Sequence, residues 1–469
     1  MHRTTKETYS LRVHWLLPFL LLPSVAAAPA WAYALYLSAS RNTAALPIAM
    51  LALVGLNGLL IRQLVRSQPV FGRLIRIGFL FKALAVACFM IVLLAVYRGG
   101  DALLYHLKAT ILADHFWEFG QLPDLFSEGG TDFVNRLTGT IYIVLGKSFA
   151  SGMLLFGCLG YWGCYFYLRT FQRMFPTRNL SVTAVMLFFF PSLVFWTASV
   201  GKDAIVLFSS GLLCYGASRL LTGGGWAGAT LTALGLVGTG FARPHIALML
   251  LLAAVVSFTF SRSSPLLSHN VTRMLGILLF IPALLLLAPL VQRYIGLEEL
   301  SLGSSVDYLE HRLLVTTSGG SSFGAASFLR RLLFAPLLLI RPLPWEAHNL
   351  TSAIAAAEGI LFLVVLIVFR KNFIANLLRV RRNPLLLFIL LFVIEFLLIF
   401  SSIGNFGILA RQRVMVFPLL FLFFSAPAET SNELESPASY PPGAQAPSSP
   451  TTEASFSSEE QASASRARA

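Results

Sequence analysis

Residues 77–97, IGFLFKALAVACFMIVLLAVY, form an apolar run that is long enough to cross a lipid bilayer as a helix. A transmembrane helix needs about 20 predominantly apolar residues to span roughly 30 Å of hydrocarbon. Similar runs recur along the chain up to about residue 425. Because a helix satisfies its own backbone polar groups, such runs predict transmembrane helices. The predicted fold class is therefore an all-α integral membrane protein.

The composition of the whole chain supports the same class. Of its 469 residues, 56% are hydrophobic and only 12% are charged, and the mean hydropathy is +0.74. This is more apolar surface than a water-soluble core can bury. We see no series of alternating ten-residue strands of the kind that builds an outer-membrane barrel. The chain is expected to use lipid as its solvent.

About twelve transmembrane helices are expected from these runs. Their ranges are 14–37, 44–62, 77–97, 148–168, 180–199, 203–221, 226–243, 246–261, 272–293, 350–369, 384–402 and 408–425. The first run is too long for a signal-peptide core and lacks a convincing cleavage site, so it is expected to be retained as a helix.

Basic residues occur at alternate turns between the predicted helices, which sets the topology. They are Arg62, Arg66, Arg73, Arg76, Arg169, Arg173, Arg178, Arg219, Arg262, Arg273, Arg370, Lys371, Arg379, Arg381 and Arg382. Positive charge marks the cytoplasmic side of a membrane protein. We therefore expect a bacterial inner-membrane protein with both termini in the cytoplasm.

Residues 1–426 are expected to form one polytopic domain with two long periplasmic loops, at about 98–147 and 294–349. The first loop contains ALLYHLKATILADHF from Ala102, whose apolar residues recur at helical spacing opposite Lys108 and Asp114. This pattern predicts an amphipathic helix on the membrane surface. Residues 427–469 are rich in Ser, Pro, Ala and Glu and are expected to be a disordered cytoplasmic tail.

Several function classes find no support in the sequence. The four cysteines, Cys88, Cys158, Cys164 and Cys214, lie in apolar runs without metal-ligand spacing, and a packing role is expected for them. The net charge of +14 is spread over short turns, so topology accounts for it without nucleic acid. No HExxH, Walker A or GxSxG motif is present, and we expect no metal and no cofactor.

A second group of charged residues gathers at the predicted periplasmic ends of the helices, where cytoplasmic anchoring does not explain them. Its members are Asp101, Lys202, Asp203, Arg243, His245, Arg341, Glu346, His348, Arg411 and Arg413. Charges near bilayer depth cost roughly 2.5 to 3.5 kcal/mol each, which makes them candidates for function. If these helix ends converge, they form a basic pocket with a few carboxylates.

Such a pocket suits a phosphate or pyrophosphate on a lipid. Guanidinium groups bind phosphate oxygens bidentately and neutralise the charge on a departing phosphate. The predicted phosphate ligands are Lys202, Arg243, Arg341, Arg411 and Arg413. A nearby carboxylate could deprotonate an attacking sugar hydroxyl, and Asp101 and Glu346 are the candidates. The predicted supporting residues are Asp203, His245, His348, Glu358 and Glu395.

Structural roles are also open for these residues. Asp101 could cap the surface helix, and Asp203 could be stabilised by a helix dipole with Lys202 as its counterion. Arg243, Arg411 and Arg413 could extend to lipid headgroups. Glu358 and Glu395 could be hydrogen-bonded structural acids. His106 and His115 are expected to be surface-helix residues without a ligand role.

Four segments of the sequence together resemble a known enzyme group. They are RGGDALLY from Arg98, FWTASVGKDA from Phe195, RPLPWE from Arg341 and GNFGILARQR from Gly404. Across about residues 98–418 the chain resembles bacterial polytopic glycosyltransferases of the GT-C type and the related Wzy-type polymerases of exopolysaccharide or O-antigen repeat units.

This resemblance implies a GT-C-like fold and glycosyl transfer from undecaprenyl-linked sugars or oligosaccharides at the periplasmic face. It also implies that Asp101 is the catalytic or acceptor-side carboxylate and that the outer arginines hold the lipid phosphate. The expected lack of a soluble outer domain favours a polymerase, with other polysaccharide assembly proteins as candidate partners. The alternatives are a transferase of single sugars and, in another class, a flippase of the same lipid-linked sugars.

Overall fold

The computed structural model describes residues 17–67, 71–222, 225–260, 281, 285, 289, 334–348, 350–401, 403 and 405–427. The chain divides into two units, Met1–Ala428 and Glu429–Ala469, and all the described residues lie in the first unit. The span predicted at 272–293, apart from residues 281, 285 and 289, lies outside the described residues, as do most of the second predicted loop and the predicted tail after residue 427.

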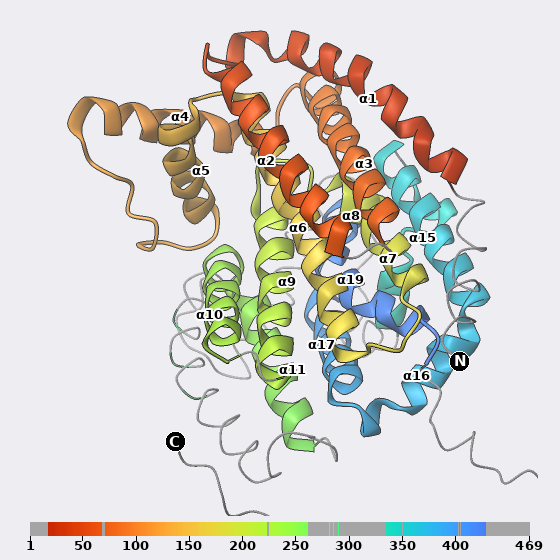
Figure 1. The fold of residues 1–469 in the computed structure, drawn as a ribbon. Coiled ribbons are helices and arrows are strands. Elements are labelled where there is room, and N and C mark those ends of the chain that lie inside the picture. The colour runs from red at the N-terminus through yellow and green to blue at the C-terminus, as the bar shows by residue number, and fades with distance from the viewer. Residues whose placement is uncertain are drawn as a thin grey trace, which may run out of the picture. The chain divides into compact units, whose positions relative to one another are not determined.

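Every regular element of the described residues is a helix (Figure 1). The α-helices are α1 (Leu17–Leu37), α2 (Leu46–Ser67), α3 (Gly72–Ile91), α4 (Asp101–Phe119), α5 (Thr131–Leu145), α6 (Phe149–Met174), α7 (Ser181–Phe189), α8 (Pro191–Phe195), α9 (Lys202–Leu221), α10 (Gly225–Ala242), α11 (Pro244–Phe260), α15 (Leu350–Val368), α16 (Arg370–Leu378), α17 (Pro384–Phe400), α18 (Phe406–Gln412) and α19 (Phe417–Leu420). Short helices of other types are η2 (Ala39–Arg41), η3 (Val92–Tyr97), η4 (Ala335–Leu339), η5 (Pro344–Glu346), η6 (Val380–Arg382), η7 (Arg413–Met415) and η8 (Phe421–Phe424).

Four helices within the described ranges are long and apolar enough to cross a membrane. They cover Leu46–Arg66, Gly72–Tyr97, Phe149–Met174 and Lys202–Leu221. Two bent pairs raise the number to six if each pair is one span: Ser352–Val368 with Arg370–Leu378, bent by 71°, and Phe406–Met415 with Phe417–Phe424, bent by 55°. The all-helical membrane class is thus supported by four to six candidate spans, and the count of twelve stays a prediction.

Two of the predicted spans are broken helices in the structure. The span expected at 180–199 ends at Phe189, and the short α8 begins at Pro191 after the extended residue Phe190. Proline has no backbone N–H and cannot continue the hydrogen bonds of a helix, but it fits the first position of a new one. The span expected at 408–425 is likewise divided among four short helices.

Helix α9 packs closely against α6 and α10, with glycines at the contacts (Figure 1). A Cβ atom added to Gly163 of α6 would lie 2.5 Å from the carbonyl oxygen of Leu207, and one added to Gly235 of α10 would lie 2.5 Å from that of Ser209. Small residues allow helix backbones to approach this closely, as is common in membrane helix pairs. Glycines at these positions therefore allow α9 to be held between its neighbours.

The first predicted loop contains the expected helix from Ala102, here α4, and a second helix, α5, that was not predicted. In Figure 1, α4 runs across the direction of α9. The buried alanines Ala109 and Ala113 face α5, and the ring of His106 lies 2.8 Å from the Tyr142 hydroxyl, measured from Nδ1. An ion pair joins Asp114 of α4 to Lys147, which lies just after the end of α5. The loop is thus an ordered helical hairpin.

The two ends of α9 carry different charged residues. Its first turn contains Lys202 and Asp203, whereas its last turn contains Arg219. Beside that last turn, Nε of Arg173 at the end of α6 donates to the hydroxyl of Thr222. Because 20 helical residues rise about 30 Å, these ends are separated by about the thickness of the bilayer hydrocarbon.

Candidate functional site

A cavity of about 400 Å³ lies at the end of α9 that carries Lys202. Its size is within the range of small-molecule sites, roughly 300–1,000 Å³. The lining comes from α4 and α5, the start of α9, the junction of α10 and α11, the end of α17 and α18. The lining residues are Asp101, Leu104, Tyr105, Lys108, Thr131, Asn135, Lys202, Arg243, His245, Phe400, Ile408, Arg411 and Gln412.

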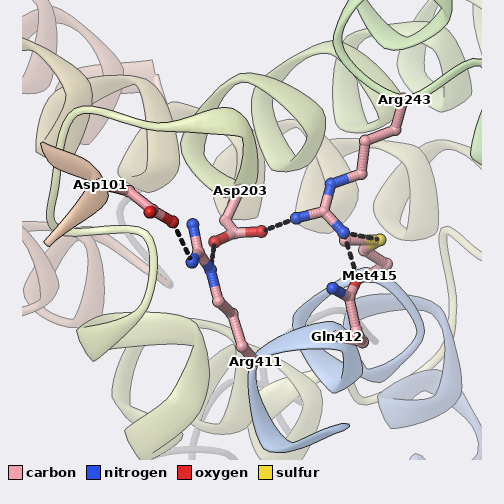
Figure 2. Close-up of polar contacts among 6 residues, drawn as sticks. All are labelled: Asp101, Asp203, Arg243, Arg411, Gln412 and Met415. Carbon is pink, nitrogen blue, oxygen red and sulfur yellow. Dashed lines mark hydrogen bonds and ion pairs between the residues drawn. The ribbon is translucent and has the colours of Figure 1, made fainter. Parts of the chain in front are cut away.

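Asp203 organises the cationic wall of this cavity (Figure 2). Its Oδ1 accepts a hydrogen bond from Nη2 of Arg243 at 2.5 Å, and its Oδ2 accepts one from Nε of Arg411. The Asp203 side chain is only 2% exposed. A buried carboxylate needs paired positive charge because burial alone would disfavour its charged form. Asp203 therefore positions both guanidinium groups.

Arg411 joins this buried acid to an exposed one. Its Nη1 donates to Oδ2 of Asp101 over 3.0 Å, while its Nε is bound to Asp203 (Figure 2). The side chain of Asp101 is 61% exposed, and that of Arg411 is 28% exposed. Residues from α4, α9 and α18, more than 300 positions apart at the extremes, thus form one ion-pair chain.

Arg243 lies deeper than Arg411. It follows the last residue of α10, directly before Pro244, and its side chain is 6% exposed. Besides Asp203, its guanidinium donates to Oε1 of Gln412 and lies 3.8 Å from the Met415 sulfur. Both Nη atoms of Arg243 are therefore used in holding α18 and η7 against α9.

The charges around the cavity favour an anionic ligand. Four cationic residues, Lys108, Lys202, Arg243 and Arg411, line it, and the carboxylates of Asp101 and Asp203 oppose them. This leaves an excess of two positive charges, with His245 also in the lining. A cleft with one sign of charge concentrates ligands of the opposite sign. Of the predicted phosphate ligands, Lys202, Arg243 and Arg411 meet here.

A neutral polar side of the cavity was missed by the sequence analysis. Tyr105 of α4 and Thr131 and Asn135 of α5 lie there. Burial is the main cause that raises the pKa of Tyr105, while a hydrogen bond with Thr131 acts in the opposite direction. The side chain of Asn135 is 3% exposed, and its Nδ2 donates to Asp132 over 3.2 Å. No sequence signal identified these residues, because α5 itself was not expected.

A separate cluster holds the other predicted phosphate ligands, outside the cavity lining. Arg341 forms an ion pair with Glu346, and its guanidinium lies 5.4 Å from the centre of the Phe406 ring. Burial acts to raise the pKa of Glu346, but hydrogen bonds from Arg341 and the Leu343 amide outweigh it and leave the pKa below its ordinary value. The Arg341–Pro342 peptide bond is cis.

Arg413 is fully buried and is not among the residues that line the cavity. Its Nη1 donates to the Leu339 carbonyl over 3.0 Å, and its Nη2 donates to the Arg341 carbonyl. Glu358 of α15 is 8% exposed and lies close enough to act on Arg413 electrostatically. These contacts give Arg413 a structural role in fixing the segment after η4. A role in phosphate binding stays a prediction for Arg413, as it does for Arg341.

The remaining predicted site residues lie outside the cavity lining. Glu346, the second candidate base, and Glu358 belong to the cluster around Arg341 and Arg413. Glu395 is partly buried on α17, and His348 is exposed after η5. Of the predicted acids, only Asp101 lines the cavity.

Within the described part of the chain, no three His, Cys, Asp or Glu residues are grouped so that they could hold a metal ion. Comparison with protein-family models, curated proteins and solved structures finds no match to this chain.

Proposed function

We propose that the protein is a membrane glycosyl-transfer enzyme that uses polyprenyl phosphate- or pyrophosphate-linked sugars, as Wzy-type polymerases of polysaccharide repeat units do. One observation carries the proposal. Lys202, Arg243 and Arg411 come from three distant segments and line one cavity together with an exposed acid, Asp101. The GT-C-like arrangement of about twelve helices is part of the same proposal.

The cationic wall is suited to a phosphate group. Guanidinium and ammonium groups form charge-assisted hydrogen bonds with phosphate oxygens. They also stabilise charge that develops on a leaving phosphate, because the charge meets donors that are already in place. Asp203 supports this preorganisation by holding Arg243 and Arg411 in fixed positions.

The placement of the cavity supports work at the periplasmic face. It lies at the Lys202 end of α9, whereas the arginine-rich turns include Arg173, beside the Thr222 end. Since positive charge concentrates in cytoplasmic turns, the cavity end is assigned to the opposite side of the membrane. A periplasmic site would receive lipid-linked sugars after they have crossed the inner membrane.

Asp101 is proposed as the general base of the transfer. The acceptor hydroxyl oxygen would bond to the anomeric carbon of the donor, and its proton would pass to the Asp101 carboxylate. The bond between that carbon and the phosphate oxygen would break, and the phosphate would leave with its electron pair on the polyprenyl carrier. Arg411 and Lys202 would neutralise the leaving group.

Purified protein in lipid with undecaprenyl pyrophosphate-linked repeat units tests this function. A ladder of longer glycans is expected, and Arg411→Ala should abolish it without loss of membrane insertion. Arg381→Ala, an exposed arginine of η6, is the matched control and should leave the ladder intact. Addition of only one sugar would identify a single-sugar transferase, and no reaction with any lipid-linked donor would rule out the enzyme.

A flippase of the same lipid-linked sugars is the second candidate, and the helix breaks favour it. The bend of 55° between Phe406–Met415 and Phe417–Phe424 directly follows the cavity residues Arg411 and Gln412. Transporters often bind substrate at such discontinuous helices. Sealed vesicles separate the two candidates: movement of a labelled lipid across the bilayer without glycan growth would identify a flippase.

A further inference from the structure

Arg411 holds two carboxylates in unlike surroundings. Asp203 is 2% exposed and binds two arginines, whereas Asp101 is 61% exposed, with Arg411 as its ion-pair partner. We propose that Asp101 is a displaceable ligand of Arg411, which the donor phosphate replaces, so that binding of the donor releases the base. This inference rests on the proposed function and adds to it an order of events.

The two ion pairs of Arg411 differ in how readily they break. An exposed pair contributes little because water solvates both charges once they separate. Removal of a partner from a buried pair leaves an uncompensated charge in a poorly solvated place. An incoming anion would therefore exchange with Asp101 and leave the contact with Asp203 intact.

The contacts of the guanidinium nitrogens of Arg243 and Arg411 support the same exchange. In Arg243, Nη2 binds Asp203 and Nη1 binds Gln412, and its side chain is 6% exposed. In Arg411, Nη1 faces the exposed Asp101 over 3.0 Å, and the side chain is 28% exposed. Among the hydrogen-bonded Nη atoms of the two arginines, Nη1 of Arg411 is thus the one that a ligand can take without disturbing the buried contacts (Figure 2).

Displacement by the donor phosphate would make the Asp101 carboxylate available as a base only after the donor has bound. While Asp101 is paired with Arg411, Oδ2 of its carboxylate accepts a hydrogen bond from the guanidinium and is not available to an acceptor hydroxyl. After the exchange, Arg411 is neutralised by phosphate, and Asp101 lies beside the bound donor with its oxygens open to the proton of the acceptor hydroxyl. Proton acceptance would then depend on an occupied donor site.

Binding of a sugar-free, short-chain polyprenyl phosphate to the full-length protein in nanodiscs tests the competition directly. Asp101→Asn should bind this probe about fivefold more tightly than the wild type, because an exposed ion pair that no longer competes corresponds to about 1 kcal/mol. The same variant should lose glycan transfer by at least about 100-fold, the usual contribution of a general base. Asp101→Ser, which also removes the carboxylate, should behave in the same way.

Asp132→Asn is the matched control. Asp132 lies in the first turn of α5 and is absent from the cavity lining, so its removal changes the local charge by the same amount without freeing Arg411. Its affinity for the probe should stay within about twofold of the wild type. Equal tightening in both variants would show a general charge effect and would overturn the displacement.

These experiments distinguish an error in the displacement of Asp101 from an error in the proposed glycosyl transfer. If the wild type transfers sugar but Asp101→Asn binds the probe equally or more weakly, Asp101 is not a competitor of the phosphate and only the inference is lost. If the wild type neither binds the probe nor transfers sugar, the proposed function itself is wrong and the inference is lost with it.

Discussion

Asp203 and Arg411 form an ion pair across 208 residues of sequence, and this contact joins the start of α9 to α18. The other oxygen of Asp203 binds Arg243, which follows the last residue of α10. One buried carboxylate therefore fixes three chain segments relative to one another. This relationship makes Asp203 a positioning residue rather than a candidate base.

Asp203→Asn should damage both the fold and the activity. Loss of the charge leaves two arginines without their common partner, and the removal of one member of a buried ion pair costs about 3 kcal/mol or more. Thermal unfolding in detergent should show the loss. Asp114→Asn breaks the exposed pair with Lys147 and should cost less than about 1 kcal/mol. Equal effects of the two variants would contradict the central role of Asp203.

His106 should make the α4–α5 hairpin sensitive to acid. Burial, and then the charge of Arg41, lowers the pKa of His106 to about 4 from 6.5. Below pH 6.5 the unfolded chain therefore takes up a proton that the folded chain excludes until about pH 4. Because the folded pKa is lowered, stability is retained above pH 6.5 and decreases as the pH falls towards 4.

His106→Gln removes the titrating ring and keeps a polar group opposite Tyr142. The unfolding temperature of the wild type should fall more than that of His106→Gln when the pH is lowered from 7 to 5. Parallel decreases in the two proteins would show that other groups dominate this pH range.

Gly359→Ala should destabilise the protein strongly. A Cβ atom at Gly359 of α15 would lie 2.0 Å from the Ile340 carbonyl oxygen, and overpacking against backbone costs about 1–3 kcal/mol or more. Gly55→Ala on α2 is the control because its Cβ would meet nothing within 4 Å. That change should stabilise its helix by about 0.5–1 kcal/mol. Unfolding temperatures that move in the same direction would contradict this packing.

Lys82→Met should weaken the segment that leads to the cavity. The Lys82 ammonium donates to the Val194 carbonyl over 2.7 Å and to the Thr197 hydroxyl, a few residues before Lys202. Methionine fills a similar volume but leaves these acceptors without a donor, which costs about 1–3 kcal/mol for each buried group. Both the unfolding temperature and the rate of glycan transfer should fall.

Lys371→Met is the control for this change. Lys371 is exposed on α16, so its loss should alter neither quantity. An unchanged melting temperature in Lys82→Met would show that the buried ammonium does not hold the end of α8.

Local patterns predicted helices well where the apolar runs were long and uninterrupted. The runs at 77–97 and 203–221 closely match α3 with η3 and α9. The breaks at Pro191 and near Pro418 were missed because mean hydropathy does not register the loss of a backbone donor. Helix α5 was missed although apolar residues recur at helical spacing within Thr131–Leu145, because the segment after the first loop helix was interpreted as a loop.

The sequence by itself determined that the chain is helical and suited to lipid, because hydrophobic length is a local property. It also indicated which cationic residues are not explained by anchoring at the cytoplasmic face of the membrane. Tertiary structure alone decided which of them share a cavity, as the example of Arg411 and Arg413 shows. Residues two positions apart on a helix point about 200° from each other, so Arg411 faces Asp101 and Asp203 while Arg413 binds the backbone of Leu339.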